Sequence, residues 1–352
     1  MLPLSILDLA VVRRGQPVSE ALAESVTLAQ DADRLGCFTR LWFAEHHNMP
    51  SIASAATSVL IAHVAARTER IRVGSGGIML PNHAPLVIAE QFGTLAELHP
   101  GRIDLGLGRA PGTDPRTLLA LRRDTHASDR FPDDIRELQG YLGDETLIKG
   151  INAYPGKGTK VPVYVLGSSL YGAQLAAAFG LPYAFASHFA PDALEQAVAV
   201  YRERFQPSAQ LERPHVIAAL NVVAADTTDE ATAMYASVLR SRVRSLASRV
   251  APDRPIEDDE LEVLMDSQVG AQARHMLTYT AVGDGPAVAA YLEEFAELAQ
   301  ADELMVTNAA PGLDQRRRAL EILATLTPEP RLSFPSPGEK AHLGDTTVAS
   351  LR

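Results

Sequence analysis

Several features that define other protein classes are scarce or absent in this sequence of 352 residues. It contains one cysteine, Cys37, which excludes a disulfide within the chain and leaves too few thiolates for a cysteine-based zinc site. No window approaches eighteen uninterrupted apolar residues, so the sequence predicts no transmembrane helix. The N-terminus carries no small-residue cleavage site of a secretory signal. We therefore expect a cytoplasmic protein in which Cys37 is a buried, unreactive thiol.

An excess of positive charge is also missing. The chain has 32 Lys and Arg against 43 Asp and Glu, which gives a formal net charge of −11. This balance provides no general attraction to nucleic acid or to anionic membranes, and we expect neither as a partner. With 46% hydrophobic, 21% charged and 6% aromatic residues, the composition is typical of a soluble globular protein with a large core and excludes a disordered chain.

Short runs of β-branched and apolar residues recur along the chain, with helical patterns between them. The predicted strands are Leu4–Leu9, Leu41–Glu45, Ile71–Leu80, Arg102–Gly108, Val161–Leu166, Tyr183–His188, Val216–Ala224 and Glu303–Thr307. The predicted helices are Ser19–Leu35, Ala53–Arg67, Leu86–Leu98, Gly172–Ala178, Pro191–Phe205 and Asp229–Ala247. Eight strands alternating with helices predict an α/β fold, the closed (β/α)8 TIM barrel. A doubly wound open sheet is disfavoured, because no glycine-rich phosphate turn follows the first strand.

Two connections are longer than a bare barrel needs. They are the insertions Ala110–Lys160, after the fourth strand, and Ala225–Asp302, after the seventh. Long loops of this kind usually build an active site or its lid. We expect residues 1–326 to form one barrel domain, followed by a proline-rich tail over residues 327–352 that cannot be a continuous helix.

Polar residues follow several of the predicted strands, where barrels of this type carry their chemistry. His46 and His47 lie at the end of the second strand. Because consecutive strand residues point to opposite faces, these histidines would rarely converge on one ion, and we predict no metal site. One imidazole facing the barrel mouth could transfer a proton near neutral pH, and His188 after the sixth strand has a similar position. An alternative stays open in which His46 and His47 only satisfy loop backbone groups.

A candidate phosphate site follows the fifth strand. Gly167, Ser168, Ser169 and Tyr171 connect this strand to a helix, and such a turn presents backbone N–H groups, hydroxyls and the positive end of the helix dipole to an anion. Arg109, at the end of the neighbouring strand, could add a guanidinium fork to the same phosphate. The alternative is that this arginine pairs with an aspartate five residues later and that the serines only cap the helix.

Gly76 and Gly77 interrupt the third predicted strand. Such a pair marks a backbone bulge or the close approach of a flat group. A ring lying near this pair and His46, with its phosphate at the fifth strand, describes a flat phosphorylated cofactor. Flavin mononucleotide (FMN) fits that description best.

At this point the motifs identify a family. The chain resembles the bacterial luciferase-like flavin-dependent monooxygenases over nearly its whole length, from about Leu4 to Ala324. The stretches that carry the resemblance are Ala44–Pro50, Ile71–His83, Gly101–Ala110 and Leu166–Ser169. Each stretch alone is modest evidence, but four in order on the expected strands are specific for this family.

The resemblance implies an FMN-type (β/α)8 barrel, commonly a homodimer. Such an enzyme receives FMNH2 from a separate NAD(P)H:flavin reductase and reacts it with O2 to form an oxygenating C4a-hydroperoxyflavin. His46 falls on the family's catalytic histidine, which assists proton transfer. Gly76 and Gly77 fall on a non-prolyl cis peptide beneath the flavin ring. Arg109 and Ser168 fall on phosphate-binding positions.

The start of the helix near Tyr171 also matches the phosphate site of the family, and we include Gly108, Gly167 and Ser169 among the cofactor-binding residues. Two of these positions depart from luciferase itself, which has a reactive cysteine at Gly108 and a glutamate at Gly167. The first difference argues against light emission. The closer likeness is to single-chain members, some of which resemble tailoring oxygenases of aromatic polyketides.

Three functions remain open at this stage. The leading one is a two-component monooxygenase acting on a hydrophobic or aromatic small molecule, with Asn48, Met49, Met79 and His188 as candidate pocket residues. The second is a sister branch that transfers hydride with a deazaflavin coenzyme. The third is a flavin-binding protein without catalysis.

Overall fold

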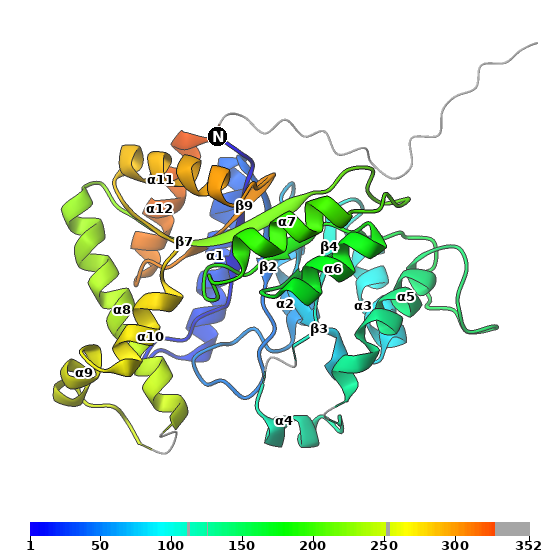
Figure 1. The fold of residues 1–352 in the computed structure, drawn as a ribbon, viewed down its shortest axis with the longest axis horizontal. Helices are drawn as coiled ribbons and strands as arrows, with labels where there is room; N and C mark the ends of the chain where they lie inside the picture. Colours follow the sequence, from blue (N-terminus) through cyan, green and yellow to red (C-terminus); the bar gives the residue numbers. More distant parts are fainter. Residues whose placement is uncertain (111–112, 125, 251–253, 328–352) are drawn as a thin grey trace, which may run out of the picture.

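The computed structural model describes residues 1–110, 113–124, 126–250 and 254–327, apart from the side chains of residues 249 and 250. In these residues a parallel sheet closes into a barrel surrounded by helices, as the sequence predicts (Figure 1). The strands are β1 Leu4–Asp8, β2 Phe38–Phe43, β3 Arg72–Met79, β4 Ile103–Gly108, β5 Val163–Gly167, β6 Tyr183–Phe185, β7 Val216–Ala224, β8 Thr280–Gly283 and β9 Glu303–Asn308.

The ring runs from β1 to β7 in chain order, continues to β9 and returns to β1. All of these pairings are parallel. The extra strand β8 was not predicted. It pairs with Asn221–Ala224 of β7, whereas β6 pairs with Val216–Ala218 of the same strand. Strand β8 therefore extends the sheet where the short β6 has ended, and its four residues are too few to show a strand pattern in sequence.

Helices occupy the connections between the strands and cover the barrel. They are α1 Val18–Leu35, α2 Thr57–Ala65, α3 Pro85–Leu98, α4 Pro115–Ala120, α5 Phe131–Leu142, α6 Leu170–Phe179, α7 Leu194–Arg204, α8 Thr228–Val250, α9 Asp258–Met265, α10 Gln268–Met276, α11 Gly285–Leu298 and α12 Leu313–Leu326. In Figure 1, the helices α8, α9 and α10 lie to one side of the barrel and form a helical insertion. They form their own small apolar cluster, so the second predicted insertion has a core of its own.

The predicted element bounds need three corrections. Strand β2 begins at Phe38, three residues before its prediction, because the charged Arg40 inside it broke the apolar pattern. Strand β6 ends at Phe185, so His188 lies in the following turn. Helix α2 begins at Thr57, after a loop that was included in the predicted helix. The end of α1 is as predicted, because Gly36 adopts φ 72°, the left-handed conformation that favours glycine.

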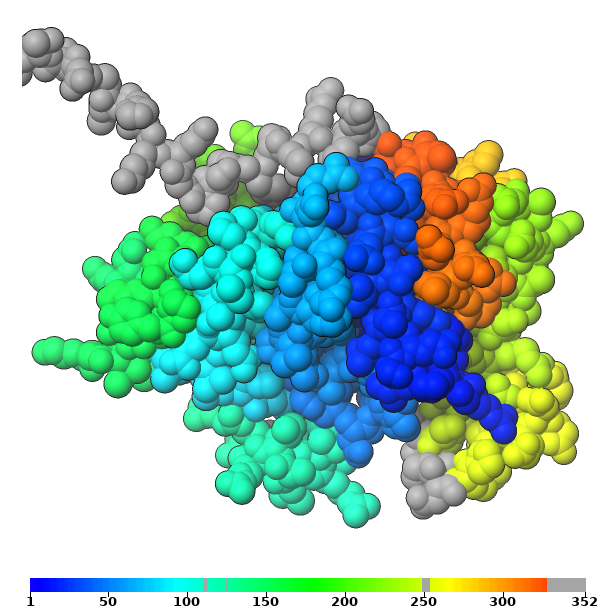
Figure 2. All heavy atoms as spheres, turned by 180° about the vertical axis from the view of Figure 1, so that it is seen from behind, coloured from blue at the N-terminus to red at the C-terminus, as the bar shows by residue number. Residues whose placement is uncertain are grey.

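Helices α1 and α12 pack together and bring the two ends of the barrel domain into contact. Figure 2 shows this face, with the blue α1 region beside the orange α12. Arg317 Nε of α12 lies 2.6 Å from a carboxylate oxygen of Asp31 of α1, and Arg316 pairs with Glu24. Cys37, at the start of β2, is buried as predicted.

Among the described residues, no helix is long and apolar enough to cross a membrane. The predicted proline-rich tail, apart from Thr327, lies outside the described residues.

Candidate active site

Charged and polar side chains fill the amino end of the barrel, at the first residues of its strands. The fully buried Arg40 donates from Nε and Nη2 to the two carboxylate oxygens of Glu303, at 2.8 and 3.0 Å. Its Nη1 donates to Asp104 Oδ2 at 2.8 Å and to the Tyr164 hydroxyl at 2.7 Å. Trp42 Nε1 donates to the same aspartate oxygen at 3.0 Å. We call Arg40, Asp104, Tyr164 and Glu303 the amino-end cluster.

These contacts keep both carboxyls of the amino-end cluster ionised. Burial alone would raise the pKa of Glu303, but the charge of Arg40 and a hydrogen bond from His215 lower it to about 2. Burial also opposes the ionisation of Asp104, and the guanidiniums of Arg72 and Arg40 hold the pKa of this carboxyl below its usual value. The buried charges therefore compensate one another. Their salt bridges fill the interior of the barrel at this end.

The glycine pair in β3 lies in a bulge and contains a cis peptide. The Gly76–Gly77 bond is cis, as the family resemblance implied, and the register between β3 and β4 shifts at this point. A Cβ on Gly76 would lie 2.8 Å from Leu7 Cδ1, and one on Gly77 would lie 2.7 Å from the carbonyl oxygen of Gly106. Glycine is required at both positions because the inner barrel packs directly against their α-carbons.

The predicted phosphate-binding residues meet at the carboxyl ends of β4 and β5. Arg109 follows β4, and its guanidinium carbon lies 4.1 Å from the centre of the Tyr171 ring in the first turn of α6. Ser169 is the N-cap of α6 but makes no side-chain hydrogen bond to the helix. Asp114 instead caps α4, and no described residue forms an ion pair with Arg109. Among the described residues, Arg109 therefore does not pair with Asp114 and the Ser169 hydroxyl does not cap α6, whereas the role of Ser168 stays a prediction.

This corner can hold an anion. The N-terminal N–H groups of α6 have no partner within their helix, and the helix dipole adds partial positive charge at this point. The exposed Arg109 supplies a full positive charge beside them, and Ser168 is half-buried at the same turn. Gly167 has room for a side chain, because a Cβ there would lie 3.9 Å from the α-carbon of Gly172. The arrangement suits a phosphate monoester.

The two histidines predicted at the barrel mouth, His46 and His188, interact electrostatically. His46 is half-buried, and its backbone N–H donates to the carbonyl oxygen of Ser54 at 3.3 Å. Burial, followed by the positive charges of Arg242 and His46, lowers the pKa of His188 to about 3. His188 is therefore neutral at neutral pH, and its buried Nδ1 has no hydrogen-bond partner among the described residues. A neutral imidazole can contact a polar group of a bound molecule.

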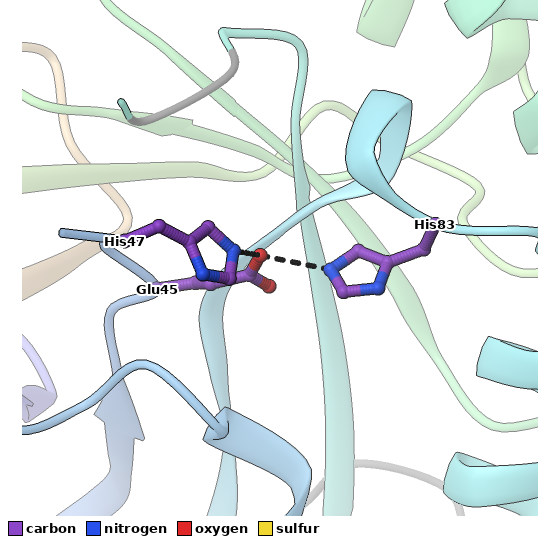
Figure 3. A group of neighbouring side chains, drawn as sticks. All are labelled: Glu45, His47 and His83. Atoms are coloured by element: carbon purple, nitrogen blue, oxygen red, sulfur yellow. Dashed lines mark hydrogen bonds and ion pairs between the residues drawn. The ribbon is translucent and has the colours of Figure 1, made fainter. Parts of the chain in front are cut away.

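His47 belongs to a different group, together with Glu45 and His83. Its Nε2 lies 2.7 Å from Glu45 Oε1, and His83 Nε2 lies 2.8 Å from the same oxygen (Figure 3). The other carboxylate oxygen of Glu45 accepts the Met79 backbone N–H at 3.2 Å. The hydrogen bond to Glu45 raises the pKa of His47, with burial opposing it. Burial raises the pKa of Glu45, but hydrogen bonds from both imidazoles lower it below its ordinary value.

The remaining candidate pocket residues are dispersed over the loops after β2 and β3. Asn48 is exposed and donates from Nδ2 to Asp114 Oδ2 at 3.1 Å, which links the loop after β2 to the start of α4. Met49 and Met79 are half-buried. The sulfur of Met79 lies 2.8 Å from the position of a Cβ on Gly108, so a side chain at that glycine would displace the methionine. Whether Asn48, Met49, Met79 and His188 line one pocket stays a prediction.

Sequence reasoning missed three residues of this end of the barrel. Glu45 and His83 lie within stretches that carry the family resemblance, but neither residue was assigned a role from the sequence. The Pro-Asn-His segment directly after β3 was the available signal, since the ends of adjacent parallel strands meet. Arg242 lies on α8, in the second insertion, and no local pattern connects it to His188.

Two solved structures of low sequence identity share the fold. The oxygenating constituent of 3,6-diketocamphane monooxygenase from Pseudomonas putida, in complex with FMN, superposes with a TM-score of 0.70 at 17% identity, over 93% of this chain and 98% of that chain. The coenzyme F420-dependent tetrahydromethanopterin reductase from Methanopyrus kandleri superposes with a TM-score of 0.65 at 16% identity, over 93% and 98% of the two chains. At these identities the likeness establishes the fold alone.

Closer relatives establish more than the fold. A luciferase-like monooxygenase from Escherichia coli is 46% identical over 90% of this chain and 95% of its own length. The N-acetyl-S-alkylcysteine monooxygenase of Bacillus subtilis is 35% identical over 66% of this chain and 70% of its own. The structure of apo-MsnO8 has a TM-score of 0.81 at 32% identity, covering 93% and 98% of the two chains. The sequence pattern described as luciferase-like monooxygenase matches residues 2–302. The chain therefore belongs to the luciferase-like monooxygenase family.

Proposed function

We propose that this monooxygenase binds reduced FMN at the carboxyl end of the barrel and uses it with O2 to oxygenate a hydrophobic or aromatic small molecule. The observation that carries the proposal is the corner formed by Arg109, Tyr171 and the N-terminus of α6. It provides a cation and free N–H groups at one point, which is what the phosphate of FMN requires.

The residues near the ring position also fit a flavin. The cis Gly76–Gly77 pair lies on β3, next to β4, whose end carries Arg109. A flavin phosphate held at that arginine and at Ser168 would direct the ring system toward β3 and His46. Reduced flavin supplies two electrons, so that one atom of O2 enters the substrate and the other leaves as water.

His46 is proposed to hold or move a proton at the reacting centre. It is half-buried and lies at the barrel end where this family carries out its chemistry. A positioned imidazole of this kind typically contributes 10²- to 10⁴-fold to a proton-transfer step. His188 remains neutral and is proposed to contact the substrate together with Asn48, Met49 and Met79.

The proposal includes two partners outside the chain. A separate NAD(P)H:flavin reductase supplies FMNH2, and a second copy of the chain completes a homodimer. Membership of the family supports both proposals. The half-buried Met49 and Met79 support a hydrophobic or aromatic substrate, because thioether side chains adapt to apolar ligands.

Anaerobic titration of the purified full chain with FMNH2 tests the cofactor, with reduced F420 titrated in parallel. We expect saturable FMNH2 binding and, after mixing with oxygenated buffer, an oxidation course slower than that of free FMNH2. Binding of reduced F420 in place of FMNH2 would show that the chain belongs to the branch that transfers hydride with a deazaflavin coenzyme. Binding of FMNH2 with an unchanged oxidation course would indicate a flavin-binding protein without catalysis.

Substitution of His46 tests its role. His46→Ala is expected to bind FMNH2 with an affinity within a few-fold of wild type. The rate of the flavin–oxygen reaction should fall by about 10²-fold or more, because only the proton transfer is lost. His63→Ala provides the matched control, since this imidazole is exposed on α2. Equal oxidation courses for wild type and both variants would remove His46 from the mechanism.

A further inference from the structure

We propose that Glu45, His47 and His83 form a binding site for one divalent transition-metal ion. The three side chains come from the loop after β2 and the segment after β3, and their potential ligand atoms all lie within 4.8 Å of one another. In Figure 3 the two imidazoles approach the carboxylate from opposite sides, each directing Nε2 toward it. The inference does not rest on the proposed flavin, because the triad is argued from its own ligand geometry, although Glu45 and His47 flank His46 and Glu45 accepts the backbone N–H of Met79.

The spacing of the ligand atoms is close to what a metal needs. Both Nε2 atoms lie 2.7–2.8 Å from Glu45 Oε1. Around a tetrahedral ion with metal–ligand bonds of about 2.1 Å, ligand atoms are separated by about 3.4 Å. Each Nε2 must therefore move about half an ångström away from Oε1, and the two Nε2 atoms, which lie within 4.8 Å of each other, must come to about 3.4 Å. The side chains of His47 and His83 are 18% and 28% exposed, so they have space for this adjustment.

The carboxylate is already oriented for such a role. Glu45 is buried, and its Oε2 accepts the backbone N–H of Met79 at 3.2 Å, which leaves Oε1 facing the two rings. A hydrogen bond to the non-coordinating oxygen is the kind of outer contact that orients ligands in metal sites. Glu45 is also the only acidic residue of the triad, so its negative charge attracts a cation bound between the two imidazoles.

The ligand set selects the class of ion. Two imidazole nitrogens with one carboxylate oxygen suit Zn²⁺, Co²⁺ or Fe²⁺, whereas Mg²⁺ and Ca²⁺ prefer oxygen ligands throughout. Three protein ligands leave at least one coordination position for water or another small ligand. In the bound state each ring presents the lone pair of Nε2 and carries its proton on Nδ1.

The site can be tested by metal binding to the untagged full chain, without flavin. We expect isothermal titration with Zn²⁺ to give one tight site per chain, and Co²⁺ to give visible d–d absorption of a four- or five-coordinate ion. His47→Gln and His83→Gln should each weaken the binding by roughly 100-fold and remove the cobalt bands. Glutamine retains an N–H donor for Glu45, so the fold should survive both changes, which circular dichroism checks.

His63→Gln is the matched control, because this exposed histidine of α2 does not belong to the triad and is bonded to Arg67. It should bind Zn²⁺ as wild type does. The proposal is overturned if wild type, His47→Gln and His83→Gln, all folded, bind Zn²⁺ equally and give the same cobalt spectrum. In that case the triad is a hydrogen-bonded array that fastens the segment after β3 to the end of β2.

Discussion

The amino end and the carboxyl end of the barrel differ in whether their polar groups have partners within the protein. At the amino end, the buried charges of Arg40, Asp104 and Glu303 are matched to one another by short hydrogen bonds. At the carboxyl end, Arg109 has no ion pair among the described residues, and the buried His188 keeps an unpartnered ring nitrogen. The first end resembles a satisfied core, and the second retains unused binding capacity.

This difference separates stability from function within one fold. A compensated buried pair contributes little net energy but becomes very costly when one partner is removed. An uncompensated group reduces stability in the free protein and gains energy when a ligand supplies the missing partner. Substitutions at the two ends should therefore produce opposite effects in unfolding and in binding experiments.

The largest effect is expected from breaking the amino-end cluster. Arg40→Leu leaves the buried carboxylate of Glu303 without its guanidinium and leaves Asp104 with the guanidinium of Arg72 alone, and we expect the free energy of unfolding to fall by about 3–5 kcal/mol. Urea denaturation followed by circular dichroism measures this loss. Arg109→Leu, at the other end, should change the unfolding free energy by no more than about 0.5 kcal/mol. Similar losses in both variants would contradict the comparison.

The reverse order is expected for flavin binding. Arg109→Leu removes the cation of the phosphate corner and should weaken FMNH2 binding by about 10- to 100-fold, the value of a charge-assisted hydrogen bond. Arg109→Lys should recover part of this loss, because it keeps the charge without the planar fork. Anaerobic fluorescence titration measures both. Unaltered affinity in Arg109→Leu would place the phosphate elsewhere.

Acid should act on the two ends in different pH ranges. The folded pKa of His188, about 3, lies below the ordinary histidine value, so the unfolded chain takes up a proton that the folded chain does not. Its contribution to stability is complete above pH 6.5 and decreases as the pH falls. We expect a loss of about 2 kcal/mol between pH 7.5 and 5.

His188→Gln should flatten the stability profile over that range. In this variant the free energy of unfolding should still decrease below about pH 4.3. In that range Glu303 takes up a proton in the unfolded chain but stays ionised in the folded chain, where its pKa is about 2. Urea midpoints measured at several pH values distinguish the two ranges. A profile for His188→Gln as steep as wild type between pH 7.5 and 5 would contradict the assignment.

The smallest effect is expected at Tyr171. Its ring lies against the guanidinium of Arg109 and helps to orient it, with 38% of the tyrosine exposed. Tyr171→Leu should weaken FMNH2 binding by only about 2- to 5-fold, as expected for an exposed cation–π contact. Tyr171→Phe, which keeps the ring, should match wild type. An effect as large as that of Arg109→Leu would mean that the tyrosine itself contacts the flavin.

Much of the carboxyl end was predictable because its residues follow strands directly. The positions of Arg109, Ser168, Ser169 and the glycine bulge at Gly76 could be inferred once the strands were recognised, since parallel strands bring their ends to one rim. The family resemblance added the cis peptide and the role of His46. The first of these is present in the structure, and the second stays a prediction.

The amino-end cluster and the Glu45–His47–His83 triad were not predictable, because they bring together residues that are distant in sequence. The pairing of Arg40 with Glu303 joins residues 263 positions apart, and His83 reaches Glu45 across 38 positions. A single charged residue in an apolar strand signals only that some partner exists. The identity of that partner depends on the register of the closed barrel.

The sequence by itself determined the order of the eight barrel strands, the rim on which the chemistry is placed and the family to which the chain belongs. These follow from local periodicity and from motifs of adjacent residues. Only the tertiary structure decided that the amino end is held by a buried salt-bridge cluster, that His188 is buried, and that Glu45, His47 and His83 converge. The physical reason is that closure of the barrel selects which distant side chains share a buried space, and local patterns carry no information about that selection.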